Sequence, residues 1–359
     1  MTVLIVPAAG DSTRFEHLRP KFLLQHPMGK TMLAAGLEGI PDNIKRDLST
    51  AVIVVQKEHM LDVDKEVLIT QIKDSIGISP KFLELENKTN SQVDTIAKGI
   101  DFMGVDEPIL VKDCDNFVSF HSSQISDEEN FVAFADLRRH TEVVAFNKAF
   151  VQLDEGKRIF GIIEKEIISP FIFTGFAKFS SASSFMAANY SLEKQGTIFV
   201  SDIVKVLIDQ GYIFFGLEAE EYEDWGTLRD WSKYSRRFAS LLVDIDGVLS
   251  FNMSPIAKSK NWMEFSPIQE NVESLLSYQE SGKVKIVFLT SRSSRFKNSL
   301  REYLTDLGFR NFELICDLPH AKRILINDFA DSNPYPSAIA INMERNSHTL
   351  NKSIFHFLN

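Results

Sequence analysis

Residues 3 to 15 of the chain read Val3-Leu4-Ile5-Val6-Pro7-Ala8-Ala9-Gly10-Asp11-Ser12-Thr13-Arg14-Phe15. The apolar run 3–6 is short enough to be one buried strand. The small residues after it let the backbone approach a ligand closely, and successive amide N–H groups can hold phosphate oxygens. Arg14 and, further on, Lys21 add positive charge for a polyphosphate. An ordinary strand–turn–helix is the alternative, which the spacing of Arg14 and Lys21 disfavours.

Length and composition bound the class of protein. The chain has 359 residues, more than one ordinary domain needs, so two domains are expected. Its formal net charge of −10 argues against a general nucleic-acid-binding surface. No apolar run is long enough to cross a bilayer and no cleavable leader is visible, so no membrane contact is expected. Cys114 and Cys316 lie far apart and are interpreted as reduced thiols, which favours a cytoplasmic location.

Further apolar runs indicate a sheet in the first half of the chain. Runs 51–55, 82–85 and 108–111 are each typical of a buried strand. They alternate with helical patterns, which predicts a mostly parallel sheet covered by helices on both faces. Residues 143–146 and 159–163 are expected to form a further pair of strands.

Acidic residues follow the strand predicted at 108–111. Asp113 and Asp115 stand at the carboxyl end of this strand, where α/β sheets place their ligands. Carboxylates there suit Mg²⁺, which binds them together with substrate phosphates. An acidic turn capping the next segment is the alternative for the pair, and Asp113 by itself could assist or be solvated.

Residues 3–24 resemble the N-terminal signature of the sugar-phosphate nucleotidyltransferases. That signature is a strand, then Ala-Ala-Gly-x-Gly-Ser/Thr-Arg-Phe/Leu and Pro-Lys-x-Leu, and here Ser12 replaces the second glycine. The resemblance implies catalytic roles for Arg14 and Lys21. It implies nucleotide binding by the loop residues Ala8, Ala9, Gly10, Ser12 and Thr13.

Residues 90–99 are similar to the segment of that family that holds the base. Gln92 and Thr95 match its Gly-Gln-x-x-Thr, in which the glutamine reads the base. A side-chain amide can pair with the donor–acceptor edge of a pyrimidine. A simple helix start capped by Asn90 or Ser91 is the alternative.

Three later segments resemble the same family. Asp115-Asn116 aligns with its Gly-Asp-Asn and Asp224 with its Asp-x-Gly-Thr, so Asp115 and Asp224 are the implied Mg²⁺ ligands. Glu164-Lys165 resembles the Glu-Lys pair, which implies that Glu164 binds sugar hydroxyls and Lys165 the acceptor phosphate. The following strand resembles the one that contacts the sugar, through Thr174 and Gly175.

The resemblance also implies a reaction. An acceptor phosphate would attack the α-phosphorus of a nucleoside triphosphate in line and release pyrophosphate. Positioning and charge neutralisation by Mg²⁺, Arg14, Lys21 and Lys165 would catalyse it. The acceptor is a sugar or polyol phosphate. CTP is favoured because the opening residues 7–15 look more like those of the cytidylyltransferases, and UTP or dTTP is the alternative.

A second domain begins near residue 236, after a polar and basic stretch. The apolar run 241–243 ends in Asp244-Ile245-Asp246-Gly247, and alternation along a strand puts both carboxylates on one side. This resembles the first motif of the haloacid-dehalogenase-like phosphatases, which implies Asp244 as nucleophile and Asp246 as general acid/base. An acidic strand end or a calcium-binding turn is the alternative.

Later motifs of this second resemblance follow in order. Thr290 follows the run 284–289, and its hydroxyl would donate a hydrogen bond to the phosphoryl group. Lys322 would stabilise the phosphate, with a surface lysine as the alternative. The implied Mg²⁺ ligands are Asp244, Asp246, Asp328 and Asp331. Residues 250–283 hold little more than a loop and a helix, which leaves no room for a large cap domain.

The sequence therefore predicts an α/β protein of two domains. Residues 1–235 are expected to form a Rossmann-like nucleotidyltransferase with a mixed sheet, and residues 236–359 a small capless haloacid-dehalogenase-like Rossmannoid domain. The expected protein is a Mg²⁺-dependent bifunctional enzyme that makes activated precursors for surface polysaccharides. A non-catalytic nucleotide-sugar-binding regulator with a degenerate second domain is the alternative. Homo-oligomer formation is left open.

Overall fold

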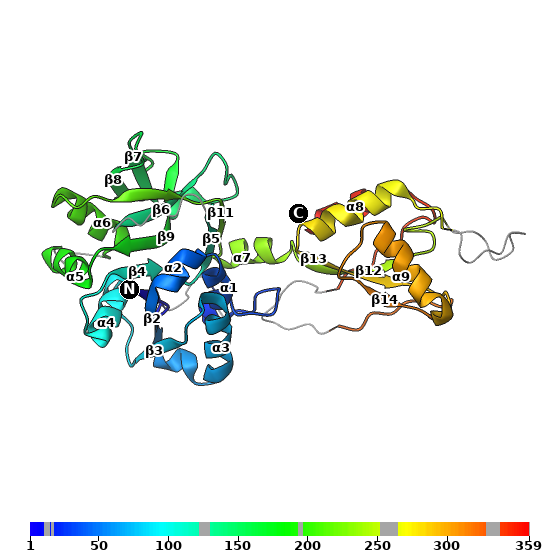
Figure 1. Ribbon diagram of the computed structural model, residues 1–359, viewed down its shortest axis with the longest axis horizontal. Helices are drawn as coiled ribbons and strands as arrows, with labels where there is room; N and C mark the ends of the chain where they lie inside the picture. The colour runs from blue at the N-terminus through cyan, green and yellow to red at the C-terminus, as the bar shows by residue number, and fades with distance from the viewer. Residues whose placement is uncertain are drawn as a thin grey trace, which may run out of the picture. The chain divides into compact units, whose positions relative to one another are not determined.

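The computed structural model describes residues 1–10, 15, 18–121, 130–192, 197–251, 265–327 and 338–358 (Figure 1). The chain divides into two compact units, Met1–Trp231 (unit 1) and Ser232–Asn359 (unit 2). This division falls a few residues before the boundary expected after residue 235. Within the described ranges, no helix combines the length and apolar character needed to span a bilayer.

Unit 1 is built on a mixed sheet, as predicted. Its strands are β1 (Thr2–Pro7), β2 (Leu48–Gln56), β3 (Pro80–Leu85), β4 (Ile109–Lys112), β6 (Phe131–Asp136), β7 (Ala149–Leu153), β8 (Ile159–Glu164), β9 (Phe171–Phe179) and β10 (Phe215–Glu218). The order is β10-β6-β9-β4-β1-β2-β3, with β7 and β8 attached at β9. Strands β1 to β4 run parallel, and β9 lies antiparallel between β4 and β6.

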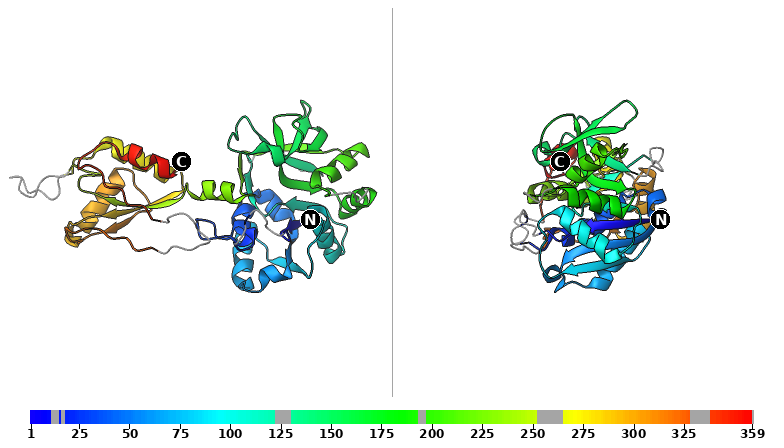
Figure 2. Two further views of the ribbon diagram at one scale, coloured as in Figure 1. Left: turned by 180° about the vertical axis from the view of Figure 1, so that it is seen from behind. Right: turned by 90° about the vertical axis from the view of Figure 1, so that its left-hand side faces the viewer.

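Helices cover both faces of this sheet (Figures 1 and 2). They are α1 (Met32–Glu38), α2 (Asp42–Asp47), α3 (Lys65–Ile76), α4 (Gln92–Met103), α5 (Ala182–Ser191) and α6 (Val200–Asp209). Along β1, Leu4 and Val6 share a core with α1 and α3, whereas Val3 and Ile5 share a core with α4, α5 and α6. Both faces of β1 are therefore buried, which is why its sequence is an unbroken apolar run.

A separate two-stranded ribbon carries two of the predicted site residues. It pairs β5 (Asn116–Ser119) with β11 (Glu221–Asp224) in antiparallel orientation. Helix α1 packs directly on it: a Cβ at Gly39 would overlap the carbonyl oxygen of Val118, and one at Gly36 would lie 2.6 Å from that of Asn116. Glycine at these two positions lets the helix backbone approach the ribbon and hold it against the body of unit 1.

One strand of unit 1 lies elsewhere than the sequence pattern indicated. The described residues 143–146 form no strand, and Val144 and Phe146 are exposed by 38% and 66%. The partner of β8 is instead β7, in which Phe150 and Val151 are fully buried. The prediction of a strand at 143–146 was wrong because both runs are apolar, and apolar character does not show which of them reaches the sheet.

Unit 2 contains, over its described residues, a parallel sheet in the order β12-β13-β14. Its elements, with the helix α7 that precedes them, are α7 (Leu228–Ser235), β12 (Ala239–Asp244), α8 (Gln269–Glu280), β13 (Val284–Leu289), α9 (Lys297–Asp306), β14 (Glu313–Ile315) and α10 (Leu350–Leu358). Apolar residues of α8, α9 and α10 share one core with the three strands. Ile324, Leu325 and Ile326, which precede the last expected acidic motif, are exposed and belong to none of these strands.

Candidate active site

The loop after β1 lies at the carboxyl edge of the sheet. Ala8 and Ala9 are buried, and Nε2 of Gln56, at the end of β2, donates a hydrogen bond to the carbonyl oxygen of Ala9 (2.7 Å). A Cβ at Gly10 would meet no described atom within 4 Å. The predicted loop residues Ser12, Thr13 and Arg14 lie outside the described residues.

Lys21 and Asp115 form an ion pair. Lys21 begins a short 3₁₀ turn, Lys21–Leu23, and its Nζ lies 2.5 Å from Oδ2 of Asp115. The two side chains are only 19% and 13% exposed, so solvent screens the pair weakly. The structure thus brings together a predicted catalytic cation and a predicted metal ligand that are 94 positions apart.

A fully buried lysine shapes the segment that carries Asp115. Nζ of Lys112, the last residue of β4, donates to the carbonyl oxygens of Asp113 (2.9 Å) and Asn116 (3.0 Å) and to the Asn116 side-chain oxygen. Burial lowers the pKa of Lys112 to about 8, although Asp113 and Asp115 act in the opposite direction. Three acceptors around one ammonium group hold residues 113–116 in a tight loop. No motif of the sequence analysis included Lys112.

Asp113 is partly buried, and its carboxylate is bonded within the protein. Its Oδ1 accepts a hydrogen bond from Nε2 of Gln92, the residue expected to read the base. Gly175 has a φ of +76°, and a Cβ there would overlap Oδ2 of Asp113. Burial, reinforced by the charge of Asp115, raises the pKa of Asp113 to about 6. The glycine expected to admit a substrate therefore also makes room for a carboxylate of the chain itself.

Asp224 is paired with a lysine that the sequence analysis missed. Nζ of Lys148 lies 2.6 Å from Oδ2 of Asp224 and donates a hydrogen bond to the Tyr222 hydroxyl oxygen (3.1 Å). Burial by itself would lower the pKa of Lys148, but Tyr222 and Asp224 together raise the pKa above its ordinary value. Lys148 therefore stays charged. The one signal for it in the sequence is a charge placed directly before the apolar residues of β7.

The two predicted metal ligands are neighbours across the β5–β11 ribbon. Asp224 pairs with Asn116 in the antiparallel ladder. The amide of Trp225, the next residue, donates to the carbonyl oxygen of Asp115 (2.9 Å). Asp115, the residue before β5, and Asp224, the last residue of β11, thus lie at the same end of the ribbon, and each forms an ion pair with a lysine.

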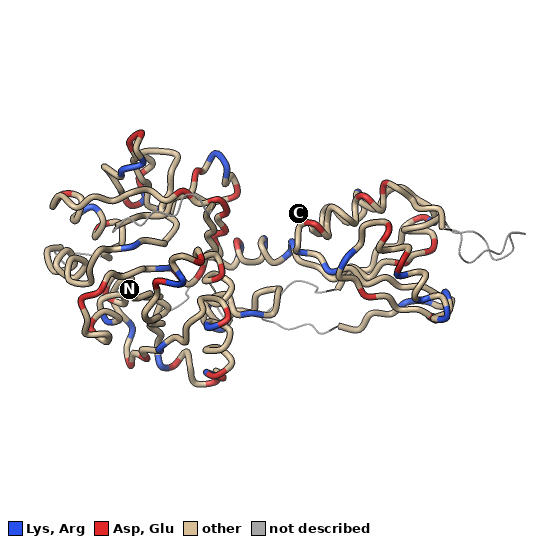
Figure 3. The backbone as a smooth tube through the Cα atoms, viewed as in Figure 1, with Lys and Arg blue, Asp and Glu red and all other residues tan. Residues whose placement is uncertain are grey.

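These groups fit a magnesium ion in number and kind. Mg²⁺ is usually held by one or two carboxylates and completes its coordination with water and substrate phosphates. Asp115 and Asp224 supply two, and five of the seven residues 218–224 are acidic, which adds negative charge around β11 (Figure 3). In the part of the chain that the structure describes, no group of three or more His, Cys, Asp or Glu side chains could hold a metal. Asp115 and Asp224 would therefore be the residues available to hold Mg²⁺ together with substrate phosphates.

The predicted Glu-Lys pair follows β8. Glu164 ends the strand, and its Oε2 accepts a hydrogen bond from the Ser201 hydroxyl (2.8 Å). Burial raises the pKa of Glu164, although the Ser201 hydrogen bond opposes the rise. Lys165 has a φ of +58°, its Nζ lies 4.5 Å from the centre of the Phe199 ring, and its amide donates to the carbonyl oxygen of Lys148 (2.9 Å). The backbone thus joins Lys165 to the residue that holds Asp224.

Two predicted binding threonines use their hydroxyl groups within the protein. Thr174 is buried in β9 and donates to the carbonyl oxygen of Ala133 (3.1 Å). Thr95 is buried in the first turns of α4, and its hydroxyl bonds to Thr89 (2.5 Å) and to the carbonyl oxygen of Ser91 (3.1 Å). Both hydroxyls therefore stabilise the elements that surround the site.

In unit 2, three predicted site residues meet at the carboxyl ends of two parallel strands. Asp244 ends β12, and Thr290 directly follows β13. The Thr290 hydroxyl donates to Oδ2 of Asp246 (3.3 Å). Desolvation and, after it, the charge of Asp246 raise the pKa of Asp244. Parallel strands place such residues at one edge of a sheet, where ligands of α/β folds bind.

An arginine that the sequence analysis passed over holds Asp246. Nη2 of Arg292 lies 2.6 Å from Oδ1 of Asp246, and Nε lies 3.0 Å from Oδ2. The Arg292 guanidinium also lies over the ring of Phe265, 4.5 Å from its centre. This bidentate interaction between guanidinium and carboxylate fixes the orientation of the Asp246 side chain.

The other predicted residues of unit 2 are Lys322, Asp328 and Asp331. Lys322 is exposed, and the cation whose charge reaches Asp244 is its neighbour Arg323. Nη1 of Arg323 donates to the carbonyl oxygens of Pro319 (2.8 Å) and Ala321 (2.9 Å). The predicted metal ligands Asp328 and Asp331 lie outside the described residues.

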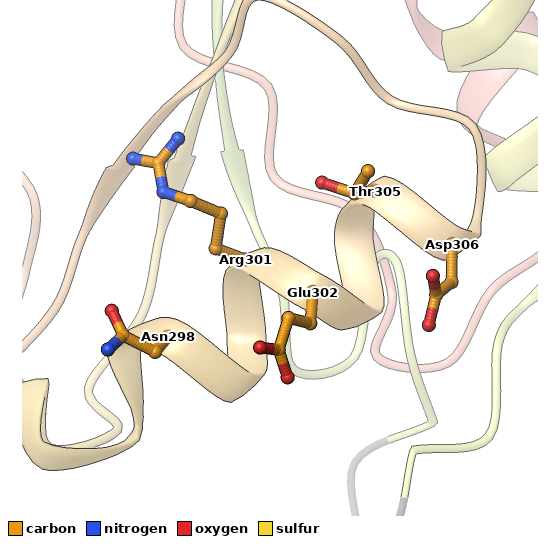
Figure 4. Close-up of a pocket in the computed structure, with 5 residues that line it drawn as sticks. All are labelled: Asn298, Arg301, Glu302, Thr305 and Asp306. Carbon is orange, nitrogen blue, oxygen red and sulfur yellow. The ribbon is translucent and has the colours of Figure 1, made fainter.

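A hollow on α9 is unrelated to these clusters. It is lined by Asn298, Arg301, Glu302, Thr305 and Asp306 (Figure 4). Residues spaced by three and four positions lie on one face of a helix. All five come from this one helix and none follows a strand end, so we assign the hollow no function.

Comparison with known proteins identifies the fold of the N-terminal part. No protein-family model matches the chain, and no curated protein sequence matches it significantly. Solved structures match at low identity. The nucleoside-diphosphate-sugar pyrophosphorylase from Vibrio cholerae RC9 has a TM-score of 0.53 and 18% identity, covering 65% of this chain and 99% of that one.

Two further structures agree. A putative glucose-1-phosphate thymidylyltransferase from Bacillus anthracis has a TM-score of 0.52 and 20% identity, covering 66% of this chain and 94% of its own. The inositol-1-phosphate CTP transferase from T. maritima has a TM-score of 0.50 and 14% identity, covering 64% and 90%. The N-terminal part of this chain therefore has the fold of these sugar-phosphate nucleotidyltransferases.

Proposed function

We propose that unit 1 is a nucleotidyltransferase that joins a nucleoside monophosphate to a sugar or polyol phosphate. The observation that carries the proposal is that Asp115 and Asp224, at the same end of the β5–β11 ribbon, are each paired with a largely buried lysine. Carboxylates that can hold Mg²⁺ and ammonium groups that can bind phosphates are the parts that transfer from a nucleoside triphosphate needs. The fold shared with known nucleotidyltransferases supports it.

The chain's own residues would act mainly by positioning. Mg²⁺ held by Asp115 and Asp224 would neutralise phosphate charge. Arg14 and Lys21 would bind the triphosphate, and Lys165 the acceptor phosphate. An acceptor phosphate oxygen would form a bond to the α-phosphorus while the bond from that phosphorus to the bridging oxygen breaks. Pyrophosphate then leaves with the electron pair of the broken bond.

The nucleotide proposed is CTP, on the resemblance of the loop after β1 to that of the cytidylyltransferases. UTP and dTTP are the alternatives, and the fold does not choose between them, because the matched structures include a CTP transferase and a thymidylyltransferase. The test is pyrophosphate release from each of the four nucleoside triphosphates with a panel of sugar and polyol phosphates. Turnover with one pair supports the proposal. Tight nucleotide binding without any turnover would favour the non-catalytic regulator instead.

A second activity is favoured by the cluster of Asp244, Asp246 and Thr290. We propose that Asp244 attacks a phosphate monoester and that Asp246 protonates the departing ester oxygen. Asp246 would then take a proton from the water that releases phosphate from Asp244. Mg²⁺ would be held there by Asp244 and Asp246 with Asp328 and Asp331. Together the two activities would supply an activated precursor, for which we propose surface polysaccharide synthesis as the setting.

The second activity has its own test. Release of phosphate from an aryl phosphate is measured for the wild type and for Asp244→Asn. The variant should lose this release, because an amide cannot act as the nucleophile. Unchanged release would remove Asp244 from that role.

A further inference from the structure

Lys148 belongs to no predicted motif, yet it is the cation on Asp224. The two side chains are 20% and 14% exposed, and Nζ lies 2.6 Å from the carboxylate oxygen. The second partner of the ammonium is the hydroxyl of Tyr222, whose side chain is buried in the core. A divalent metal on Asp224 would lie within a few ångströms of this ammonium. Their like charges repel strongly in a poorly solvated site, so metal and ammonium compete for the carboxylate.

The backbone of Lys148 ties it to the acceptor side of the site. Its carbonyl oxygen accepts a hydrogen bond from the amide of Lys165 (2.9 Å). Ala149, the next residue, pairs with Glu164 across β7 and β8. Glu164 and Lys165 are the residues proposed to bind the acceptor. The backbone therefore links the residue whose ammonium pairs with Asp224 to the residues proposed to bind the acceptor phosphate.

The same arrangement occurs at the other carboxylate, where Lys21 lies 2.5 Å from Asp115. Without a metal, two ammonium groups balance two carboxylates. A divalent ion would balance the same two carboxylates and leave both ammonium groups for phosphate oxygens. The site can therefore exchange its lysines for a metal with no net change of charge at the carboxylates.

We propose that Lys148 is an exchangeable counter-ion, which neutralises Asp224 until a divalent metal binds and then binds the acceptor phosphate. This inference rests on the proposed nucleotidyl transfer. Metal and acceptor then assist each other's binding. Metal binding at Asp224 releases the Lys148 ammonium, which can then bind the acceptor phosphate. Binding of the phosphate in turn removes that ammonium from Asp224, where it competes with the metal.

The test is titration of Mn²⁺ alone into the full chain, followed by calorimetry. Every protein compared, including the one with wild-type Lys148, carries Asp244→Asn, so that the metal site proposed in unit 2 is disabled in all of them. Lys148→Gln removes the charge but can still donate a hydrogen bond to Asp224. We expect it to bind Mn²⁺ about tenfold more tightly than the wild type, because the competing cation is gone. The KM for the acceptor phosphate should rise about tenfold, because a charged phosphate ligand is lost.

The matched control is Lys205→Gln, which removes a lysine from an exposed ion pair with Asp209 (2.8 Å). This variant should change neither the Mn²⁺ affinity nor the KM for the acceptor phosphate. Lys148→Arg keeps the charge and should bind Mn²⁺ within about twofold of the wild type. Thermal unfolding checks that each variant folds, and Lys148→Met is the second charge-removing variant should the glutamine variant not fold.

Unchanged or weaker Mn²⁺ binding by the charge-removing variant would overturn the inference. So would an unchanged KM, or a wild type that binds no Mn²⁺. The Mn²⁺ titration involves no turnover, so the two proposals fail separately. If the wild type turns over but Lys148→Gln leaves the Mn²⁺ affinity unchanged, only the counter-ion role of Lys148 is wrong. If no substrate pair gives turnover, the proposed transferase activity is wrong.

Discussion

Gly175 and Asp113 compete for the same small volume: a Cβ at Gly175 would overlap the carboxylate oxygen Oδ2 of Asp113. Gly175 also has a φ of +76°, in the left-handed region that side chains rarely adopt. Gly175→Ala should displace Asp113 from its bond with Gln92 and lower the free energy of unfolding by about 3 kcal/mol. Urea denaturation measures this loss.

Gly211→Ala is the control for the backbone contribution. Gly211 has a φ of +95°, but a Cβ there would meet no described atom within 4 Å. This variant carries the cost of the left-handed backbone without an overlap, so it should lose only about 1 kcal/mol. Equal losses in the two variants would show that the space beside residue 175 is not occupied by Asp113.

Lys112 should make the stability of unit 1 rise with pH above about 8. Burial holds its pKa at about 8 in the folded protein, against an ordinary value of 10.5. Between these values the folded state has released the proton while the unfolded state keeps it. The unfolded state then binds more protons, so the free energy of unfolding rises with pH and this contribution ends near 10.5.

Lys112→Met provides the comparison, because it has no titrating group at this position. Urea denaturation of both proteins at about pH 7 and about pH 10 gives the change in the free energy of unfolding for each protein. The wild type should gain more stability than the variant over this interval. The same gain in both proteins would contradict a buried, charged Lys112.

The sheet of unit 1 could be predicted where burial on both faces leaves an unbroken apolar run, as in β1. Strand β7 could not, because residues 143–146 and 149–151 are equally apolar. Residues 149–153 become the strand because they pair with β8. The strand propensity of a single segment does not indicate which other segment it will pair with.

The site could be predicted where a short motif carries it. Asp115 and Asp224 were expected together, and the ribbon brings them to adjacent chains. Lys148 was not expected, because its hydroxyl partner Tyr222 is 74 positions away and no local spacing marks it. Arg292 was missed for the same reason, since its bond to Asp246 spans 46 positions.

Asp224→Asn should reduce pyrophosphate release by about a hundredfold or more, because an amide lacks the charge that a divalent metal needs. Initial rates with the best substrate pair measure the loss. Glu221→Gln, an exposed acidic position on the same strand, is the control and should stay within about twofold of the wild type. An Asp224→Asn protein with wild-type rates would remove Asp224 from the proposed metal site.

Arg292→Lys should loosen Asp246, because a lysine cannot reproduce the two-pronged bond of the guanidinium. We expect the free energy of unfolding of unit 2 to fall by about 2 kcal/mol. Aryl phosphate hydrolysis should fall about tenfold, since Asp246 would no longer be held beside Asp244. Urea denaturation and initial rates measure the two effects, and Arg310→Lys, at an exposed position, should change neither. If Arg292→Lys lost stability but kept full hydrolysis, the ion pair would hold the fold together without orienting the general acid/base, and the proposed role of Asp246 would fail with it.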